Sequence, residues 1–243
     1  LDSIMNSHLP FEYEVIVFDG KSTDGTKNIL NQYSQKFKNI HVYENEKIKQ
    51  VYALNKAIAI ARGEYIVRCD AHSIYPFNYF SNIVDFYNNN TDKGVKYGNI
   101  GTSYITTSVS NNGFQSGIPD AMQHPLGIGG SHRSNKTLEV PRIVDTILFG
   151  AWPVGIFSEA GVFNENFERG QDYEHNLRLR KLGYTIAQIP GEPFKYFTRN
   201  SFKNLARMIF QYSYVKGQLL CRDKKAPNLR SYVPAAALLA LIL

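Results

Sequence analysis

Residues 64–72, with the sequence E-Y-I-V-R-C-D-A-H, constrain the fold more than any other stretch of the chain. Its apolar residues 65–67 are typical of a buried strand, and Asp70 and His72 follow where that strand ends. Because one position separates them in an extended chain, their side chains should point the same way. Ligands bind at the carboxyl ends of strands in open α/β sheets, and a carboxylate with an imidazole there suits a divalent cation and its phosphates. An alternative stays open, in which Asp70 caps the next helix and His72 is a surface residue.

Apolar strands and amphipathic helices alternate along the first part of the chain, which predicts a parallel sheet with right-handed crossovers. We expect strands at residues 14–18, 40–43 and 65–68, and helices at 26–37, 51–61 and 76–87. A section rich in Gly, Ser, Thr and Asn follows, with a mobile loop expected around residues 131–138. Elsewhere we expect strand-like pieces within 97–107, regular structure at 144–149, helices at 157–161, 172–182 and 202–221, and a strand at 184–189.

The composition is that of a folded globular protein, with 43% hydrophobic and 20% charged residues. The net charge of +6 favours an anionic substrate or an anionic membrane surface. Lys and Arg are spread out and form no block, which argues against nucleic acid as a partner. Cys69 and Cys221 have no metal-type spacing and are expected to be free thiols in a reducing compartment.

Both ends of the chain look cut. Residues 1–7 resemble part of an amphipathic helix, and residues 233–243 form an apolar run. That run is too short to span a bilayer, which takes ~20 residues. We therefore expect a fragment of a longer protein, with a membrane-associated part beyond residue 243.

Six short motifs, in order along nearly the whole chain, resemble those of family 2 glycosyltransferases. The first, V-F-D-G-K-S-T-D-G-T at 17–26, is similar to the family's V-D-D/G-G-S-x-D-G-T pattern. The others are A-L-N-K-A at 53–57, A-R-G-E-Y-I at 61–66, D-A-H at 70–72 in place of D-x-D, G-V-F-N-E-N-F at 161–167, and Q-D-Y-E-H-N-L-R-L-R-K-L-G-Y at 171–184. The D-A-H variant and the apolar tail resemble the branch that makes bacterial exopolysaccharide, the succinoglycan-type glucosyltransferases.

The resemblance implies a GT-A-like α/β fold, with a Rossmann-type, mostly parallel sheet flanked by helices. Residues 1–93 would form the nucleotide-sugar-binding half and residues 94–200 the acceptor-binding half of a domain extending over 1–220. Residues 201–243 would form a basic amphipathic helix that leads into a membrane-associated segment. Family members begin with a strand and an I-P-x-x-N-E motif that precede the strand at 14–18. If this chain is the whole protein, the sheet would lack a central strand and donor binding should suffer.

The resemblance also implies a nucleotide-sugar donor, a divalent metal and an inverting transfer. Asp19 would hold the uracil of a UDP-sugar, and Asn55 would take part in donor binding. Asp70 would lie near the ribose and the metal, and His72 would bind the metal directly. A neutral imidazole suits Mn²⁺ better than Mg²⁺, so Mn²⁺ is favoured over Mg²⁺.

Structural roles are expected for several polar residues nearby. Ser22 and Asp24 should stabilise the turn after the first strand, and Gly25 should serve the backbone there. Lys56 is expected to be an exposed helix residue. The role of Arg68, on the strand that leads to Asp70, is open.

On the acceptor side, the resemblance makes Asp172 the candidate general base. In the family this Asp takes the proton of the acceptor hydroxyl as the oxygen attacks the anomeric carbon. Helix capping is a serious alternative, because Asp is common at the N-cap. Gln171 replaces the family's Glu and is placed with Trp152 at the acceptor site, although a buried core Trp is an equally good explanation. Glu174 is the fallback base, but its spacing favours a pair with Arg178 along the helix.

The predicted activity is therefore the metal-assisted, inverting transfer of a sugar from a nucleotide donor to a lipid-linked or saccharide acceptor. The place of action would be the cytoplasmic face of a bacterial inner membrane, during surface polysaccharide synthesis. The basic helix at 202–221 could rest on anionic lipid, and an ordinary solvated face explains it nearly as well. A catalytically silent nucleotide- or sugar-binding module is the alternative function. A dinucleotide-dependent oxidoreductase is excluded, because no G-x-G-x-x-G follows the first strand.

Overall fold

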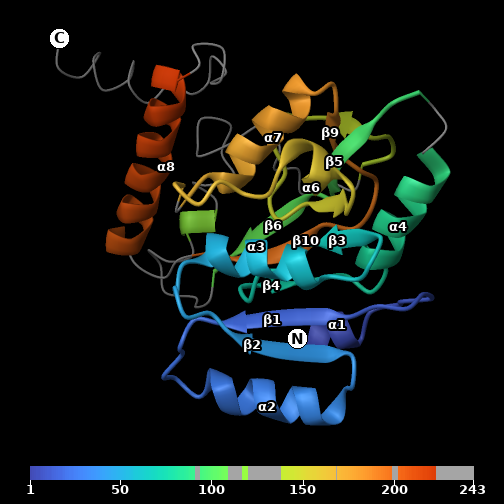
Figure 1. Cartoon of the computed structure of the whole chain (residues 1–243), viewed down its shortest axis with the longest axis vertical. Coiled ribbons are helices and arrows are strands. Elements are labelled where there is room, and N and C mark those ends of the chain that lie inside the picture. Colours follow the sequence, from blue (N-terminus) through green and yellow to red (C-terminus); the bar gives the residue numbers. More distant parts are fainter. Residues whose placement is uncertain (91–93, 109–116, 120–137, 168, 199–201, 223–243) are drawn as a thin grey trace. The chain divides into compact units, whose positions relative to one another are not determined.

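The computed structural model describes residues 1–243 apart from 91–93, 109–116, 120–137, 168, 199–201 and 223–243 (Figure 1). The loop expected around residues 131–138 thus lies almost wholly outside the described residues. The chain forms two compact units, Leu1–Asn200 and Ser201–Leu243. The larger unit holds every candidate site residue, and the smaller one contains a single long helix, α8 (Phe202–Arg222), in its described part.

The larger unit alternates helices and strands in its first half and is richer in strands in its second half. The helices are α1 (Asp2–Met5), α2 (Thr26–Lys36), α3 (Gln50–Ile60), α4 (Tyr79–Asn90), α6 (Ile156–Ala160) and α7 (Gln171–Lys181). The strands are β1 (Val15–Asp19), β2 (Ile40–Glu44), β3 (Tyr65–Val67), β4 (Ser73–Ile74), β5 (Tyr97–Gly101), β6 (Tyr104–Thr107), β7 (Arg142–Ile143), β8 (Ala151–Pro153), β9 (Thr185–Gln188) and β10 (Phe194–Phe197).

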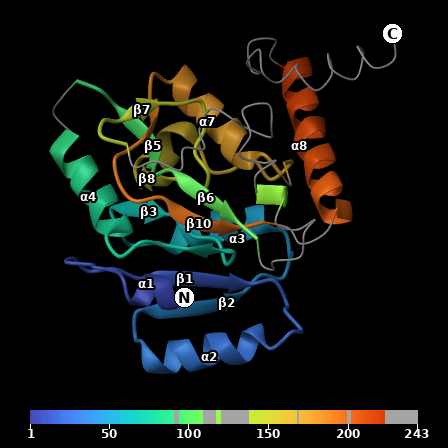
Figure 2. The ribbon, with the colours of Figure 1, turned by 180° about the vertical axis from the view of Figure 1, so that it is seen from behind.

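These strands form three sheets. The largest has the order β3-β8-β5-β9-β7, in which β5 and β9 are parallel, while β8 is antiparallel to both of its neighbours and β7 is antiparallel to β9. A second sheet has the order β4-β10-β6, and β1 and β2 form a parallel pair of their own. Figures 1 and 2 show β1, β2 and α2 on one side of α3 and the large sheet on the other side. The α/β architecture with helices around a central sheet agrees with the expected fold class, although the strand directions are mixed.

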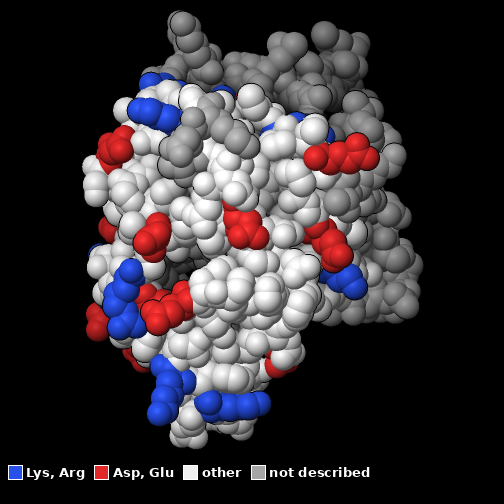
Figure 3. All heavy atoms as spheres, turned by 90° about the vertical axis from the view of Figure 1, so that its right-hand side faces the viewer, with Lys and Arg blue, Asp and Glu red and all other residues white. Residues whose placement is uncertain are grey.

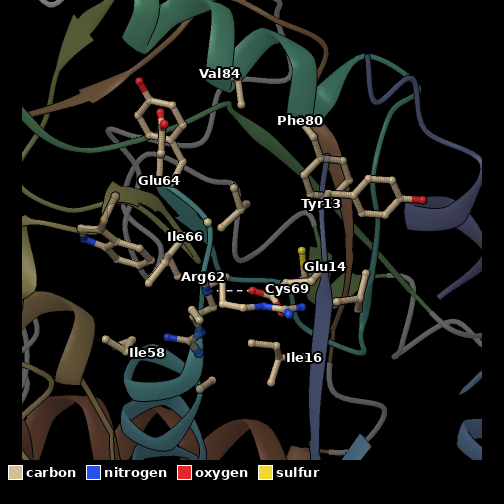
Figure 4. Close-up of a pocket in the computed structure, with 18 of the residues that line it drawn as sticks. Tyr13, Glu14, Ile16, Ile58, Arg62, Glu64, Ile66, Cys69, Phe80 and Val84 are labelled. Atoms are coloured by element: carbon tan, nitrogen blue, oxygen red, sulfur yellow. Dashed lines mark hydrogen bonds and ion pairs between the residues drawn. The ribbon is translucent and has the colours of Figure 1, made fainter. Parts of the chain in front are cut away.

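The facing edges of β1 and β3 are not paired with each other. Among the described strands, β1 pairs with β2 alone and β3 with β8 alone. Their free edges line a mainly apolar cavity of about 670 Å³, with charged side chains of both signs around the hollow on the face drawn in Figure 3. Figure 4 shows Ile16, Ile58 and Ile66 facing this space, and Arg62 paired with Glu14 (Nη2 to Oε2, 3.0 Å).

Two aromatic-rich clusters form the core of this unit. One gathers around α4, where Tyr75, Tyr79 and Phe194 pack with ring centroids 4.9–5.8 Å apart. The other gathers around Trp152 and Phe163 under α6 and α7. Aromatic side chains bury large areas, so these clusters fix the helices against the large sheet.

The observed elements differ from the expected ones at a few places. Residues 144–149 contain no helix or strand, although regular structure was expected there. They form instead an irregular approach to β8, in which Phe149 has φ 64° and Gly150 has φ 35°. The short strands β4 and β10 were not anticipated, because their pairing depends on distant partners.

Gly150 occupies a place where a side chain cannot fit. A Cβ atom there would lie 2.0 Å from Oδ1 of Asn99, which is fully buried. That Oδ1 accepts the Ala151 N–H (3.0 Å), and the Asn99 amide donates to Oδ1 of Asn176 on α7 (2.8 Å). One buried amide therefore joins β5, the start of β8 and α7.

Replacing Gly150 should destabilise the protein strongly. Gly150→Ala is expected to lower the free energy of unfolding by about 2–4 kcal/mol, because the new Cβ must displace the buried Asn99 amide in a left-handed backbone region. Gly155→Ala is the matched control, since Gly155 has φ −58° and a Cβ added there would meet open space. Urea unfolding monitored by circular dichroism measures the free energy of unfolding of both variants. Equal stabilities of the two variants would contradict this account.

Candidate active site

Asp19, the last residue of β1, is buried and serves the turn that follows it. Its Oδ2 accepts the Ser22 N–H at 3.0 Å, and its backbone carbonyl accepts the Asn45 N–H at 2.7 Å. Asp24 Oδ1 accepts the Thr26 hydroxyl (2.6 Å), and Gly25 adopts φ 84°. The structural roles expected for this turn are confirmed. Nothing in the contacts of Asp19 tests its predicted role as a uracil ligand.

Asp70 and His72 lie in the turn between β3 and β4. The Asp70 side chain is 22% exposed, and its backbone N–H donates to the hydroxyl of Tyr75 at 2.9 Å. His72 is exposed, and its carbonyl accepts the Phe197 N–H from β10 (2.8 Å). The backbone on both sides of these two residues is thus fixed while their side chains reach solvent.

The donor set at this turn suits a cation that is also held by a ligand. Within the described residues there is no cluster of three or more His, Cys, Asp or Glu side chains that could hold a metal alone. Mg²⁺ at such sites usually binds through one or two carboxylates together with substrate phosphates and water, whereas transition-metal ions also accept imidazole. One carboxylate and one imidazole could therefore supply the protein ligands of an ion such as Mn²⁺, with phosphate and water completing its coordination.

Asp172 lies in the first turn of α7 but does not cap the helix. Gly170 takes the N-cap position with φ 69°, and the helix has no side-chain cap hydrogen bond. The Asp172 Oδ1 instead accepts a hydrogen bond from Nη1 of Arg68 in a charge-assisted pair. The capping alternative is therefore wrong for this residue.

Arg68 connects Asp172 with Asp70. Its side chain is only 7% exposed, and Nη2 lies 4.0 Å from the Asp70 Oδ2. The guanidinium carbon lies 5.3 Å from the centre of the Phe149 ring. Arg is rarely so deeply buried without a partner. An arginine directly after an apolar strand was therefore the one sign in the sequence that Arg68 needs an anionic partner. The sequence could not name the partner, which lies 104 positions away.

Glu174 pairs with Arg178, as the spacing predicted. Nε of Arg178 donates to Oε1 at 2.8 Å, and Nη2 donates to Oε2 at 3.0 Å. The same Nη2 also donates to the Val162 carbonyl at 2.8 Å. Because both oxygens of Glu174 are used in this pair, Asp172 is the better placed of the two candidate bases.

The structure also places Asn55, Gln171 and Lys56. The Asn55 amide binds both the N–H and the carbonyl of Phe163 (3.0 and 2.9 Å), so it ties α3 to the 161–167 segment, and its part in donor binding stays a prediction. Gln171 is 3% exposed at the start of α7. Lys56 is exposed, as expected.

The prediction that Trp152 stacks on an acceptor sugar is not supported. Trp152 is 1% exposed, and its indole packs against Phe157, Phe163 and His175 with ring centroids 5.7–6.2 Å apart. At 1% exposure the ring offers no open face on which a sugar could stack. The core explanation, which the sequence left open, is the correct one.

The large cavity between β1 and β3 is not the candidate site. Its lining includes Arg68, but not Asp19, Asp70, His72 or Asp172. The polar side chains that could perform chemistry lie at the loops after β1 and β3 and at the start of α7. We therefore interpret the cavity as the gap between two strand edges and not as a substrate pocket.

Comparison with known sequences identifies the chain as a glycosyltransferase. The chain belongs to glycosyl transferase family 2, whose sequence model matches residues 1–133. The motif resemblance, the GT-A fold and the enzyme class predicted from the sequence are thereby confirmed.

Two curated relatives match most of the chain. A dolichyl N-acetyl-alpha-D-glucosaminyl phosphate 3-beta-D-2,3-diacetamido-2,3-dideoxy-beta-D-glucuronosyltransferase from Methanococcus voltae is 30% identical over 224 residues, which cover 90% of this chain and 68% of the relative. Succinoglycan biosynthesis protein ExoA from Rhizobium meliloti is 26% identical over 251 residues, covering 100% of this chain and 73% of the relative.

Solved structures with the same fold carry nucleotides. The S. aureus TarS fragment 1–349 in complex with UDP aligns with a TM-score of 0.60 at 15% identity, over 81% of this chain and 55% of that one. A mannosyltransferase from Pyrobaculum calidifontis in complex with GDP-Man and Mn²⁺ aligns with a TM-score of 0.61 at 20% identity, over 96% and 61%. This chain thus spans little more than half of these structures, and at such identities the likeness shows the fold alone.

His175, which follows Asp172 on α7, should make stability depend on pH. Burial, with a further contribution from Arg178, lowers the pKa of His175 from 6.5 to about 4, and its ring contacts the Gly161 carbonyl (Nε2 to O, 3.1 Å). The unfolded chain therefore binds a proton between pH 6.5 and 4 that the folded chain does not. Stability is fully present above pH 6.5, and we expect about 3 kcal/mol to be lost as the pH falls to 4.

His175→Gln provides the comparison, because Gln keeps a donor for the Gly161 carbonyl but does not titrate. Urea unfolding at pH 7, 6, 5 and 4 measures the free energy of unfolding of both proteins. The value for the unaltered protein minus that for His175→Gln should decrease as the pH falls. Parallel stability curves for the two proteins would exclude His175 as the titrating group.

Proposed function

We propose that this chain moves one sugar from a nucleotide-sugar donor, a UDP-sugar in the first instance, to a hydroxyl of a lipid-linked or saccharide acceptor, with inversion. The observation that carries the proposal is the link from Asp172 through Arg68 to Asp70. It brings the candidate base from the start of α7 to the end of β3, where the candidate donor and metal ligands lie. Open α/β sheets bind ligands at this edge.

Each side chain then has one task. Asp19 would accept a hydrogen bond from the base, while Asp70 and His72 would hold a divalent cation, with Mn²⁺ favoured over Mg²⁺. That cation would supply the positive charge that stabilises a departing diphosphate. Asp172 would take the proton of the acceptor hydroxyl through the oxygen that Arg68 leaves free. The acceptor oxygen forms a bond to the anomeric carbon, the bond to the diphosphate breaks, and the centre inverts in one displacement.

The relatives support the choice of donor, metal and acceptor. The TarS fragment was solved with UDP and the mannosyltransferase with GDP-Man and Mn²⁺. The relative from Methanococcus voltae is named for a dolichyl N-acetyl-glucosaminyl phosphate acceptor, and ExoA for succinoglycan biosynthesis. We therefore infer a role in building a surface polysaccharide.

The proposed place of action is the cytoplasmic face of a bacterial inner membrane. Helix α8 offers support, because its exposed residues include Arg207 as well as the apolar Phe210 and Tyr214. Such a combination suits an interfacial helix. Of the helices that the structure describes, none has the length and hydropathy needed to cross a bilayer.

Asp172→Asn should abolish turnover and spare donor binding. We expect kcat for transfer or hydrolysis of a UDP-sugar with Mn²⁺ to fall at least ~10²-fold, because an amide cannot take the proton. The affinity for UDP and Mn²⁺ by calorimetry should change less than threefold. Asp145→Asn is the matched control, since Asp145 also pairs with an arginine, Arg180 at 3.1 Å. Donor binding without metal-dependent turnover in the unaltered protein would favour the silent binding module instead.

His72→Ala should raise the metal requirement. We expect the Mn²⁺ concentration for half-maximal turnover to rise about 10-fold or more, because one of two protein ligands is lost. Measuring turnover at saturating donor over a range of Mn²⁺ concentrations gives this half-maximal value. His41→Ala on β2, where the imidazole neighbours Glu14 at 3.9 Å, is the control and should leave the titration unchanged. An unchanged titration for His72→Ala would remove His72 from the metal site.

A further inference from the structure

We propose that Arg68 is a positioning residue that holds Asp172 in the orientation required for proton transfer. The inference rests on the proposed function, because it needs Asp172 to be the base. The family motifs do not include this arginine, and the sequence left its role open. Its position in the structure, between two carboxylates with different proposed tasks, gives it one.

The guanidinium of Arg68 holds one oxygen of Asp172 and does not contact the other. Nη1 donates to Oδ1 of Asp172, whose side chain is 21% exposed. Among the described residues, Arg68 makes no hydrogen bond or ion pair with Oδ2 of Asp172. A carboxylate held at one oxygen keeps a defined direction for the other, which is what a base needs towards an incoming hydroxyl.

Arg68 itself is held on three sides. Its backbone N–H donates to the Gly150 carbonyl at 3.1 Å, its guanidinium lies over the Phe149 ring, and Nη2 lies near Asp70. Phe149 has φ 64°, a backbone region that is unfavourable for a bulky residue. Backbone strain of this kind concentrates at functional sites, and here it places the ring beneath the guanidinium.

A purely stabilising role does not explain this arginine well. Desolvating a guanidinium is costly, and apolar side chains of similar volume often replace buried ion pairs without loss of stability. Nε of Arg68 is also buried, and no described residue accepts a hydrogen bond from it. This unpaired donor adds to the cost of burying the guanidinium.

The decisive experiment compares Arg68→Met, Arg68→Lys and Arg68→Gln with the unaltered protein. Arg62→Met is the matched control, because Arg62 also pairs with a carboxylate, but its side chain is 74% exposed and donates to Glu14 and not to Asp172. The measurements are kcat and KM for transfer or hydrolysis of a UDP-sugar with Mn²⁺, the Kd of UDP with Mn²⁺, and the melting temperature.

For Arg68→Met we expect kcat to fall about 10²-fold, as for a reacting group displaced by about 1 Å. KM for the donor and the Kd of UDP should stay within threefold, and the melting temperature within about 5 °C. Arg68→Lys keeps the charge without the planar fork and should recover kcat to within about 10-fold of the unaltered protein. Arg62→Met should leave all four quantities unchanged.

Three results would overturn the inference. An unchanged kcat in Arg68→Met would show that Asp172 needs no support. A Kd for UDP raised about 10-fold or more with kcat retained would make Arg68 a phosphate ligand. A loss of folded protein in Arg68→Met together with full activity in Arg68→Lys and Arg68→Gln would leave only a structural role. Failure of the proposed function looks different, because Asp172→Asn would then keep full turnover or the unaltered protein would show none.

Discussion

The pair between Arg68 and Asp172 is the interaction on which the candidate site depends. A guanidinium that is 7% exposed must be paired, because an unpaired charge in a protein interior is very costly. That requirement joins the end of β3 to the first turn of α7. Without the pair, no side-chain contact among the described residues would join the candidate base directly to the end of β3.

Buried amides fix the frame around this pair. Asn99 joins β5, the start of β8 and α7, and Asn55 clamps the backbone of the segment that precedes α7. Each amide satisfies backbone or side-chain groups that would otherwise be buried without partners. A polar residue that the sequence suggests as a ligand can therefore serve to hold two backbone segments together, and Asn55 is an example.

The chemistry of the cavity between β1 and β3 explains why it is not the candidate site. The unpaired edges of β1 and β3 line an apolar space, whereas the carboxylates and the imidazole lie in loops after the strands. An apolar cavity and a diphosphate site have opposite chemistry. Charge and hydrogen-bonding capacity, and not cavity size, identify where a nucleotide-sugar would bind.

The sequence by itself determined the family, most helices and strands of the first half, the turn at Gly25 and the pair of Glu174 with Arg178. These features depend on contiguous motifs, on periodicity or on spacing along one helix, all of which are local. Tertiary structure alone decided that Trp152 is core, that Asn55 holds two backbone segments together, that Asp172 is not a cap, and that Arg68 is its partner. Each of these depends on which distant residue comes within a few ångströms, and contacts between elements far apart in the chain leave no local pattern to read.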